Sequence, residues 1–151
     1  MIIMLDANII VSAILFPQSI ISDVFKHILL NNKIVLSQYT IDEVKNVFKN
    51  KFPNKINEME SFLEKLPYKL FNLKEINNKK YPKIRDIDDL PVLANAIESN
   101  VDVLITGDKD FDEINIKKPK IMKPDKYKER YIDPNVTMND IIGAIRESRE
   151  R

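Results

Sequence analysis

Several acidic residues lie where their side chains could act together. Each stands beside the end of an apolar segment or at the start of an expected helix: Asp6, Glu43, Asp86, Asp88, Asp89, Asp108 and Asp110. Asp6 is the most telling, because it interrupts an otherwise apolar run at the beginning of the chain. A carboxylate in such a run costs free energy unless its charge is compensated, so Asp6 indicates a functional role.

Carboxylates that converge on one place repel one another. Two unit charges about 4 Å apart cost about 4 kcal/mol at an effective dielectric constant near 20. Either some of the groups take up protons or a cation binds, and an all-oxygen ligand set without His or Cys selects Mg²⁺ or Mn²⁺ rather than Zn²⁺. Mg²⁺ held in this way accepts phosphate oxygens as further ligands. The chemistry indicated is hydrolysis of phosphodiester bonds.

The apolar pattern predicts strands that alternate with helices. Strands are expected at Met1–Leu5, Lys33–Leu36, Lys69–Leu73, Val101–Ile105 and Lys120–Met122. Helices are expected from Ser19 to Asn31, from Thr40 to before Pro53, from Asn54 to Leu66, from Leu90 to Ser99 and from Thr137 to Ser148. The predicted fold class is therefore α/β, a three-layer α/β/α sandwich with a central, mainly parallel sheet. Such sheets carry their sites at the carboxyl ends of the strands, where the acidic residues would converge.

Composition excludes several other classes of protein. The chain has 151 residues, no cysteine and a formal net charge of +1. It is long enough to bury a core, and it has neither a disulfide scaffold nor a thiol nucleophile. The apolar start is not preceded by Lys or Arg and contains Asp6, which argues against a signal peptide or membrane span. We therefore expect a cytoplasmic protein without a membrane contact.

Four segments carry a resemblance to a known family. They are Leu5–Ala13, Ser37–Glu43, Arg85–Ala96 and Leu104–Phe111. In this order they resemble the successive motifs of PIN-domain proteins, and among these the VapC-like toxins of toxin–antitoxin pairs. The resemblance covers about residues 1 to 125. It implies a Mg²⁺- or Mn²⁺-dependent endoribonuclease of α/β/α fold, often homodimeric, with RNA as substrate and a cognate antitoxin protein as partner.

The resemblance also assigns roles to residues. The catalytic acids would be Asp6, Glu43, Asp89 and Asp108, and the metal ligands Asp6, Asp89, Asp108 and Asp110. Supporting roles fall to Asn8, Ser12, Asp86 and Thr106. Ala7 departs from the pattern, because family members often have Thr or Ser directly after the first Asp. The missing hydroxyl must come from elsewhere, and Ser12 is a candidate.

The family motifs do not cover the end of the chain. We expect a nuclease domain over residues 1–130 and a C-terminal helical tail over residues 131–151, whose role the sequence does not indicate.

Some singled-out residues have simpler explanations. Glu43 stands three residues after Thr40, as the acid of a capping box does, and Asp88 or Asp89 could serve only as a helix N-cap. A calcium loop beginning at Asp108 is excluded, because Glu113 stands where that loop requires Gly. The single histidine, His27, is interpreted as structural.

Other functions remain to be weighed against the toxin. The alternatives are a PIN-type nuclease for RNA processing without an antitoxin, and a catalytically silent RNA- or protein-binding module. A signalling receiver domain also gathers aspartates at strand ends, but the expected strand ending at Leu73 is followed by no phosphoacceptor Asp. Lysine runs flank the acidic residues, which would let a polyanion approach them by counterion release.

Overall fold

A five-stranded parallel sheet forms the centre of the molecule. The structure is a computed structural model that describes residues 1–135. The strands are β1 (Ile2–Leu5), β2 (Lys33–Ser37), β3 (Tyr68–Phe71), β4 (Val103–Ile105) and β5 (Lys120–Met122), in the order β3-β2-β1-β4-β5. β1 therefore lies in the middle of the sheet, with Ile3 opposite Ile34 on one side and Val103 on the other.

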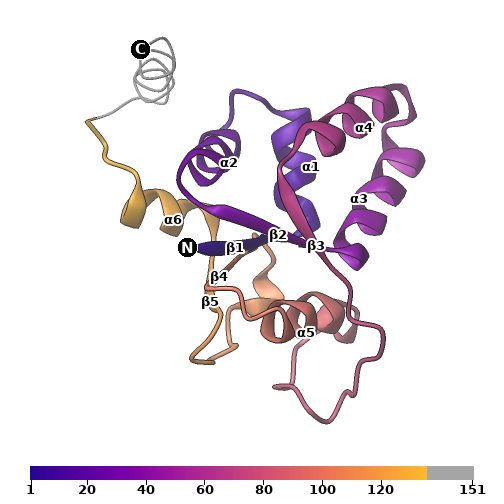
Figure 1. Ribbon diagram of the computed structural model, residues 1–151, viewed down its shortest axis with the longest axis vertical. Helices are drawn as coiled ribbons and strands as arrows, with labels where there is room; N and C mark the ends of the chain where they lie inside the picture. Colours follow the sequence, from indigo (N-terminus) through magenta and orange to yellow (C-terminus); the bar gives the residue numbers. More distant parts are fainter. Residues whose placement is uncertain (136–151) are drawn as a thin grey trace.

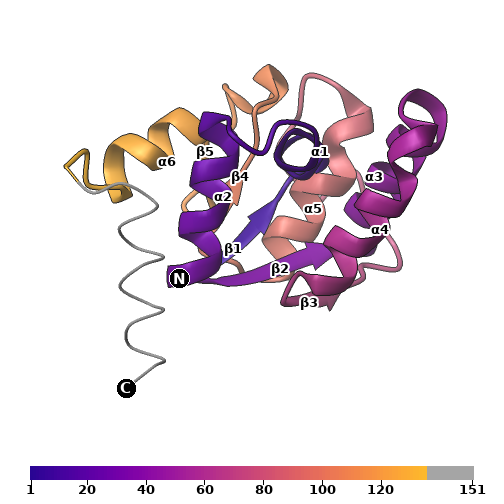
Figure 2. The same cartoon turned by 90° about the horizontal axis from the view of Figure 1, so that it is seen from above.

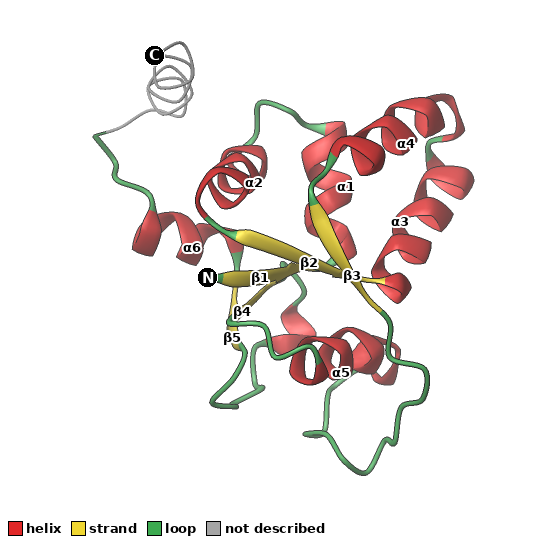
Figure 3. Ribbon diagram, in the orientation of Figure 1, coloured by secondary structure: helices red, strands yellow, loops and turns green. Residues whose placement is uncertain are grey.

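Helices connect the strands and cover both faces of the sheet (Figures 1 and 3). They are α1 (Ala7–Leu15), α2 (Ile20–Asn31), α3 (Gln38–Lys51), α4 (Ile56–Lys65), α5 (Leu90–Glu98) and α6 (Pro124–Tyr131). Short 3-10 turns occur at η1 (Pro53–Lys55), η2 (Ile87–Asp89) and η3 (Lys109–Phe111). In Figure 1, α1 to α4 lie above the sheet and α5 lies below it.

The alternation of side chains along β1 divides the core into two parts. Ile3 and Leu5 point to the side of α1 to α4, whereas Met4 points to the side of α5. All three side chains are fully buried, as expected for a strand covered on both faces. The three-layer α/β/α sandwich with a parallel sheet is confirmed, and Figure 2 shows it from above.

The direction in which the strands are added reverses between β1 and β4. The chain leaves β1 and builds β2 and β3 on one side, then crosses back to build β4 and β5 on the other. In open parallel sheets, ligands bind outside the carboxyl ends of the strands beside such a reversal. Asp6 follows β1 and Thr106 follows β4, so this edge holds the first pair of candidate site residues.

Two helices in the structure were not predicted. α1 follows Asp6 at once, but its sequence ANIIVSAIL has no polar stripe from which a helical period could be recognised. α6 is the opposite case, since it is mostly polar and buries only Pro124 and Tyr127. The predicted helix over Thr137–Ser148 lies outside the described residues.

The start of α3 also differs from the prediction. The capping box beginning at Thr40 is wrong, because the N-cap is Ser37, the last residue of β2. The Ser37 hydroxyl accepts a hydrogen bond from the backbone N–H of Thr40, and it donates to the Thr40 hydroxyl. Glu43 therefore lies in the second turn of the helix, and capping does not account for its position.

α6 packs against α2 through a polar contact in an otherwise apolar region. The Tyr127 hydroxyl lies 2.8 Å from His27 Nδ1 and accepts a hydrogen bond from the Asn32 amide. This contact agrees with the structural role expected for His27. Burial raises the pKa of Tyr127 to about 12, so its hydroxyl keeps its proton.

Within residues 1–135, no single helix is long and apolar enough to cross a membrane. α1 and α2 reach the length and apolar composition of a span only when taken together, and their axes meet at 110°.

Candidate functional site

Asp6 is fixed by hydrogen bonds from two sides. It is the N-cap of α1, and its Oδ1 accepts a hydrogen bond of 2.7 Å from the backbone N–H of Ala7. Its Oδ2 accepts one of 2.7 Å from the Thr106 hydroxyl, across the boundary between β1 and β4. Asp6 is buried, with only 6% of its surface exposed. Both carboxylate oxygens therefore have donors before any ligand is present.

The turn after β4 holds two more acidic residues in place. The Thr106 hydroxyl accepts a hydrogen bond from the N–H of Asp108, and Asp108 Oδ1 in turn accepts one from the N–H of Asp110. Asp108 is thereby the N-cap of η3. Thr106 was expected only to support this turn. It also supplies the hydroxyl at Asp6 that the sequence lacked at Ala7.

The third group of acids lies at the start of α5. Asp86 caps η2 by accepting a hydrogen bond from the N–H of Asp88. Asp89 follows directly and precedes Leu90 and Pro91, which begin α5. Asp89 occupies the N-cap position of α5, as the simpler explanation expected, but its side chain makes no capping hydrogen bond, so capping does not account for its carboxylate.

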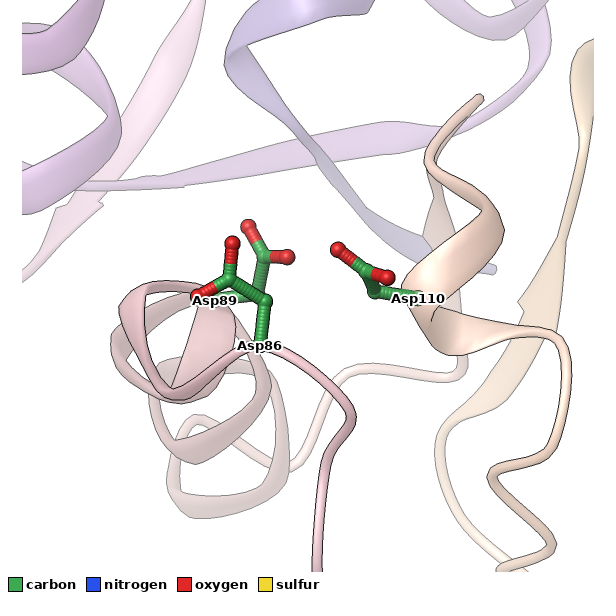
Figure 4. A group of neighbouring side chains, drawn as sticks. All are labelled: Asp86, Asp89 and Asp110. Atoms are coloured by element: carbon green, nitrogen blue, oxygen red, sulfur yellow. The ribbon is translucent and has the colours of Figure 1, made fainter.

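Three carboxylates face one another across the gap between η2 and η3. Figure 4 shows Asp86 and Asp89 on one side and Asp110 on the other. One oxygen from each of the three residues lies within 4.8 Å of the others, which is close enough for a shared cation. Asp89 and Asp110 belong to the predicted ligand set, whereas Asp86 was expected in a supporting role. Asp6 and Asp108 are not part of this group of three.

Asp89 is the acid whose ionisation is most disturbed. Burial is the main cause, and it raises the pKa of Asp89 to about 8. Contacts with the carboxyl groups of Asp110 and Asp108 raise the pKa further, because two carboxyl groups share a hydrogen bond only when one is protonated. Asp89 Oδ2 is buried, and within residues 1–135 no donor reaches it. Such an oxygen needs either a proton or a cation.

Glu43 connects α3 to this set of acids. Its pKa is raised, first by burial and then by the negative charges of Asp6 and Asp108. The pKa of Asp6 is also raised, because burial outweighs the hydrogen bonds from Thr106 and Ala7. We call the whole set the acid rim: Asp6, Glu43, Asp86, Asp89, Asp108 and Asp110. The four predicted catalytic acids all belong to it.

Sequence reasoning missed Tyr39 as a residue of the site. Tyr39 lies in the first turn of α3, and its hydroxyl donates a hydrogen bond of 3.1 Å to the backbone carbonyl of Asp88. Its pKa is raised by burial and by the charges of Glu43, Asp88, Asp89 and Asp6. A tyrosine on the exposed side of an amphipathic helix has no signal in a single sequence, although its spacing of four residues from Glu43 places both on one face.

Two predicted supporting residues have different positions relative to Asp6. The Asn8 side chain lies beside the turn after β4, where its amide nitrogen is 3.8 Å from the position that a Cβ on Gly107 would take. Ser12 lies six residues after Asp6, about 9 Å along the axis of α1. Within the described part of the chain the Ser12 side chain makes no hydrogen bond to Asp6, and the hydroxyl that contacts Asp6 is that of Thr106.

Hollows with basic walls lie on two sides of the acid rim. One, of about 740 Å³, includes Lys79, Lys83 and Arg85 and reaches Asp86. Another, of about 510 Å³, includes Lys120, Lys123 and Lys126 and reaches Asp108. Arg85 also lies 3.8 Å from Asp110, where it neutralises part of the negative charge. The lysine runs seen in the sequence thus include cations that border the site.

Comparisons with known proteins agree on the fold. A sequence model described as "PIN domain" matches residues 2–110. Among solved structures, a chain of the "Crystal structure of VapBC2 from Rickettsia felis bound to a DNA fragment from their promoter" is similar, with a TM-score of 0.60 and 20% sequence identity. The match covers 82% of this chain and 98% of that chain. No curated protein matches the sequence significantly.

Proposed function

This chain belongs to the PIN domain family, and from that premise we propose that it is a Mg²⁺- or Mn²⁺-dependent endoribonuclease. One observation carries the proposal. Four separate segments bring their carboxylates to the carboxyl edge of the sheet, where burial, together with the neighbouring carboxyl groups, raises the pKa values of Asp6, Glu43 and Asp89. Burying and crowding ionised carboxylates costs free energy unless a counter-charge is present, and such a set of acids is typical of a cation site.

The residues of the acid rim fit a hard divalent cation. They offer only oxygen atoms, and Asp89 Oδ2 is a buried acceptor with no donor in the described residues. We assign Asp86, Asp89 and Asp110 to hold the ion, with Asp6 and Asp108 beside them. A bound cation supplies charge stabilisation for a phosphate under attack and for the leaving oxygen.

The protein's own residues would orient the reacting groups. Thr106 and the N–H of Ala7 hold Asp6 in one rotamer, so its carboxylate can orient a water molecule without further ordering. The raised pKa of Glu43 makes this carboxylate a better proton acceptor. As the water oxygen bonds to phosphorus and the P–O bond to the leaving oxygen breaks, Glu43 takes a proton from the water and the leaving oxygen takes one from solvent.

The basic hollows would bind the rest of the substrate. Lys79 and Lys83 on one side and Lys120 on the other can each pair with a phosphate of the RNA backbone. Because the acid rim repels phosphates, cations on both sides are needed to bring the strand across it. We therefore expect RNA binding to weaken steeply with rising salt concentration.

We also propose that the protein is the toxin of a toxin–antitoxin pair in the cytoplasm. The proposal is supported by motifs that resemble VapC-like toxins and by the fold shared with a chain of VapBC2. On this proposal a cognate antitoxin protein silences the nuclease by covering the acid rim, and a homodimer is expected as in many family members.

The test is cleavage of a mixed RNA pool by the purified full chain with Mg²⁺, with Mn²⁺ or with a chelator. We expect cleavage with either metal, none with the chelator, and a loss of at least about a hundredfold in Asp6→Asn. The side-chain oxygen of the asparagine can still accept the N-cap hydrogen bond at position 6, so the fold should persist. Addition of Mg²⁺ should also raise the melting temperature, which reports binding independently of activity.

Asp102→Asn is a matched control. Asp102 lies at the amino end of β4, on the opposite edge of the sheet, where it accepts a hydrogen bond from the N–H of Ile2. This variant should cleave RNA like the original protein. Cleavage that survives Asp6→Asn or the chelator would contradict the proposed function.

A further inference from the structure

A third hollow, shallow and open to solvent, lies along the outer face of α3 and reaches the acid rim at Glu43. Its volume is about 260 Å³, and its lining comes entirely from α3: Tyr39, Asp42, Glu43, Asn46, Val47, Asn50 and Lys51. Tyr39, Glu43, Asn46 and Asn50 follow one another at helical spacing, so they share one face. We call this hollow the α3 groove.

The chemistry of the α3 groove differs from that of the basic hollows. Its end nearest the acid rim carries Asp42 and Glu43, and its cation, Lys51, lies at the far end. Negative charge at the near end repels phosphates, so the backbone of a nucleic acid would not enter there. The groups left to make contacts are an aromatic ring and two carboxamides.

These groups are suited to nucleobases. Tyr39 is 38% exposed, and its hydroxyl is tied to the Asp88 carbonyl, so its ring is held in place at the entrance to the groove. A fixed, partly exposed ring beside a reaction site can stack with an unpaired base. The Asn46 and Asn50 side chains are exposed, and each offers a donor and an acceptor in one plane.

Resting on the proposed nuclease function, we propose that the α3 groove recognises an unpaired base next to the cleaved phosphate, with adenine preferred. A carboxamide pairs with adenine through two hydrogen bonds: the adenine N6 amine donates to the carboxamide oxygen, and the carboxamide nitrogen donates to adenine N7. Single-stranded RNA exposes these edges. Asn46 and Asn50 lie about 5 and 10 Å beyond Glu43 along the helix axis, within reach of a nucleotide adjacent to the acid rim.

The experiment measures binding of single-stranded RNA to the full chain carrying Asp6→Asn, so that cleavage does not interfere. The probes are a short uridine-only RNA and the same RNA with one central adenosine. We expect the adenosine RNA to bind about tenfold more tightly. Asn46→Ala combined with Asn50→Ala should reduce this ratio to near one, and Tyr39→Leu should weaken binding of both RNAs.

Asn57→Ala is the matched control, since Asn57 is an exposed asparagine on the neighbouring helix α4. It should leave the adenosine preference unchanged. Alanine favours helix more than asparagine does, so loss of folding will not obscure the result. The proposal is overturned if the original groove shows no adenosine preference, or if the preference survives both asparagine substitutions.

The outcome is separable from the nuclease proposal. A protein that prefers adenosine in binding but cleaves no RNA with Mg²⁺ or Mn²⁺ would support the groove and contradict the nuclease. Metal-dependent cleavage that gives the same products for Asn46→Ala, Asn50→Ala and the original protein would support the nuclease and contradict the groove.

Discussion

The two halves of the acid rim are held in opposite ways. Around Asp6, the fold supplies a donor to each carboxylate oxygen, from Ala7 and Thr106. Around Asp89, it supplies burial and two neighbouring carboxyl groups, and leaves Oδ2 without a donor in the described residues. The Asp6 half is therefore complete without a ligand, whereas the Asp89 half is completed only by a proton or a cation. The Asp6 half therefore makes the site rigid, and the Asp89 half provides the affinity for a cation.

The largest effect should come from removing the donor on the Asp6 half. Thr106→Val leaves Asp6 Oδ2 buried without a partner and also frees the N–H of Asp108. We expect a loss of about 2 kcal/mol in the free energy of unfolding, measured by urea denaturation. The pKa of Asp6 should rise further, because the lost hydrogen bond lowers it in the original protein.

Thr106→Ser distinguishes the hydroxyl from the bulk of the side chain. Serine can make both hydrogen bonds, so most of the lost stability should return. If the serine variant is as unstable as the valine variant, the comparison fails, because packing rather than the hydroxyl would be holding this half of the rim.

A smaller effect is expected from the pH dependence of the Asp89 half. The pKa of Asp89 is about 8 in the folded protein and near its ordinary value of 3.8 when unfolded. Between these values only the folded state holds the proton, so stability without metal falls as the pH rises. In Asp89→Asn, the free energy of unfolding should fall with rising pH by about 1 kcal/mol less than in the original protein. The difference is this small because solvent screens the partly exposed carboxyl group.

Denaturation curves without metal at pH 5 and pH 8 measure this change. Mg²⁺ should have the opposite effect in the original protein, stabilising it more at the higher pH and releasing protons on binding. An Asp89→Asn variant with an unchanged pH dependence would show that another group of the rim carries the proton.

The smallest effect is expected where the two halves are joined from α3. Tyr39→Phe removes the hydrogen bond to the Asp88 carbonyl but keeps the ring. That carbonyl can turn to water, so stability should fall by only about 0.5 kcal/mol. RNA cleavage should fall a few-fold, since Asp89 would be held less firmly. A loss as large as that of Asp6→Asn would give Tyr39 a direct role in the reaction.

Much of this molecule could be predicted from its sequence. Short apolar runs predicted the positions of all five strands to within a few residues, and their alternation with helices implied the parallel sheet. Asp6 could be singled out as a candidate site residue, because a charge in an apolar run costs free energy unless it is compensated. The carboxyl ends of parallel strands then indicated where the other acids would meet it.

The features that were missed depend on contacts between distant residues. The hydrogen bond from Thr106 to Asp6 joins residues 100 positions apart, and no local pattern marks it. Ser37 serves both as the end of β2 and as the cap of α3, so the more usual capping pattern at Thr40 misled the prediction. The roles of Asp86 and Tyr39 depend on how η2 approaches η3 and α3, which the sequence alone does not specify.

The central place of β1 also has a consequence for the time at which the site forms. β1 is made first, but one of its two neighbours in the sheet, β4, is made about 100 residues later. Ribosomes add roughly 5 to 20 residues per second, so Asp6 waits several seconds for its partner Thr106. A nascent chain that has not reached this point carries half of an acid rim. The order of synthesis therefore delays the appearance of a complete site until nearly the whole domain has been translated.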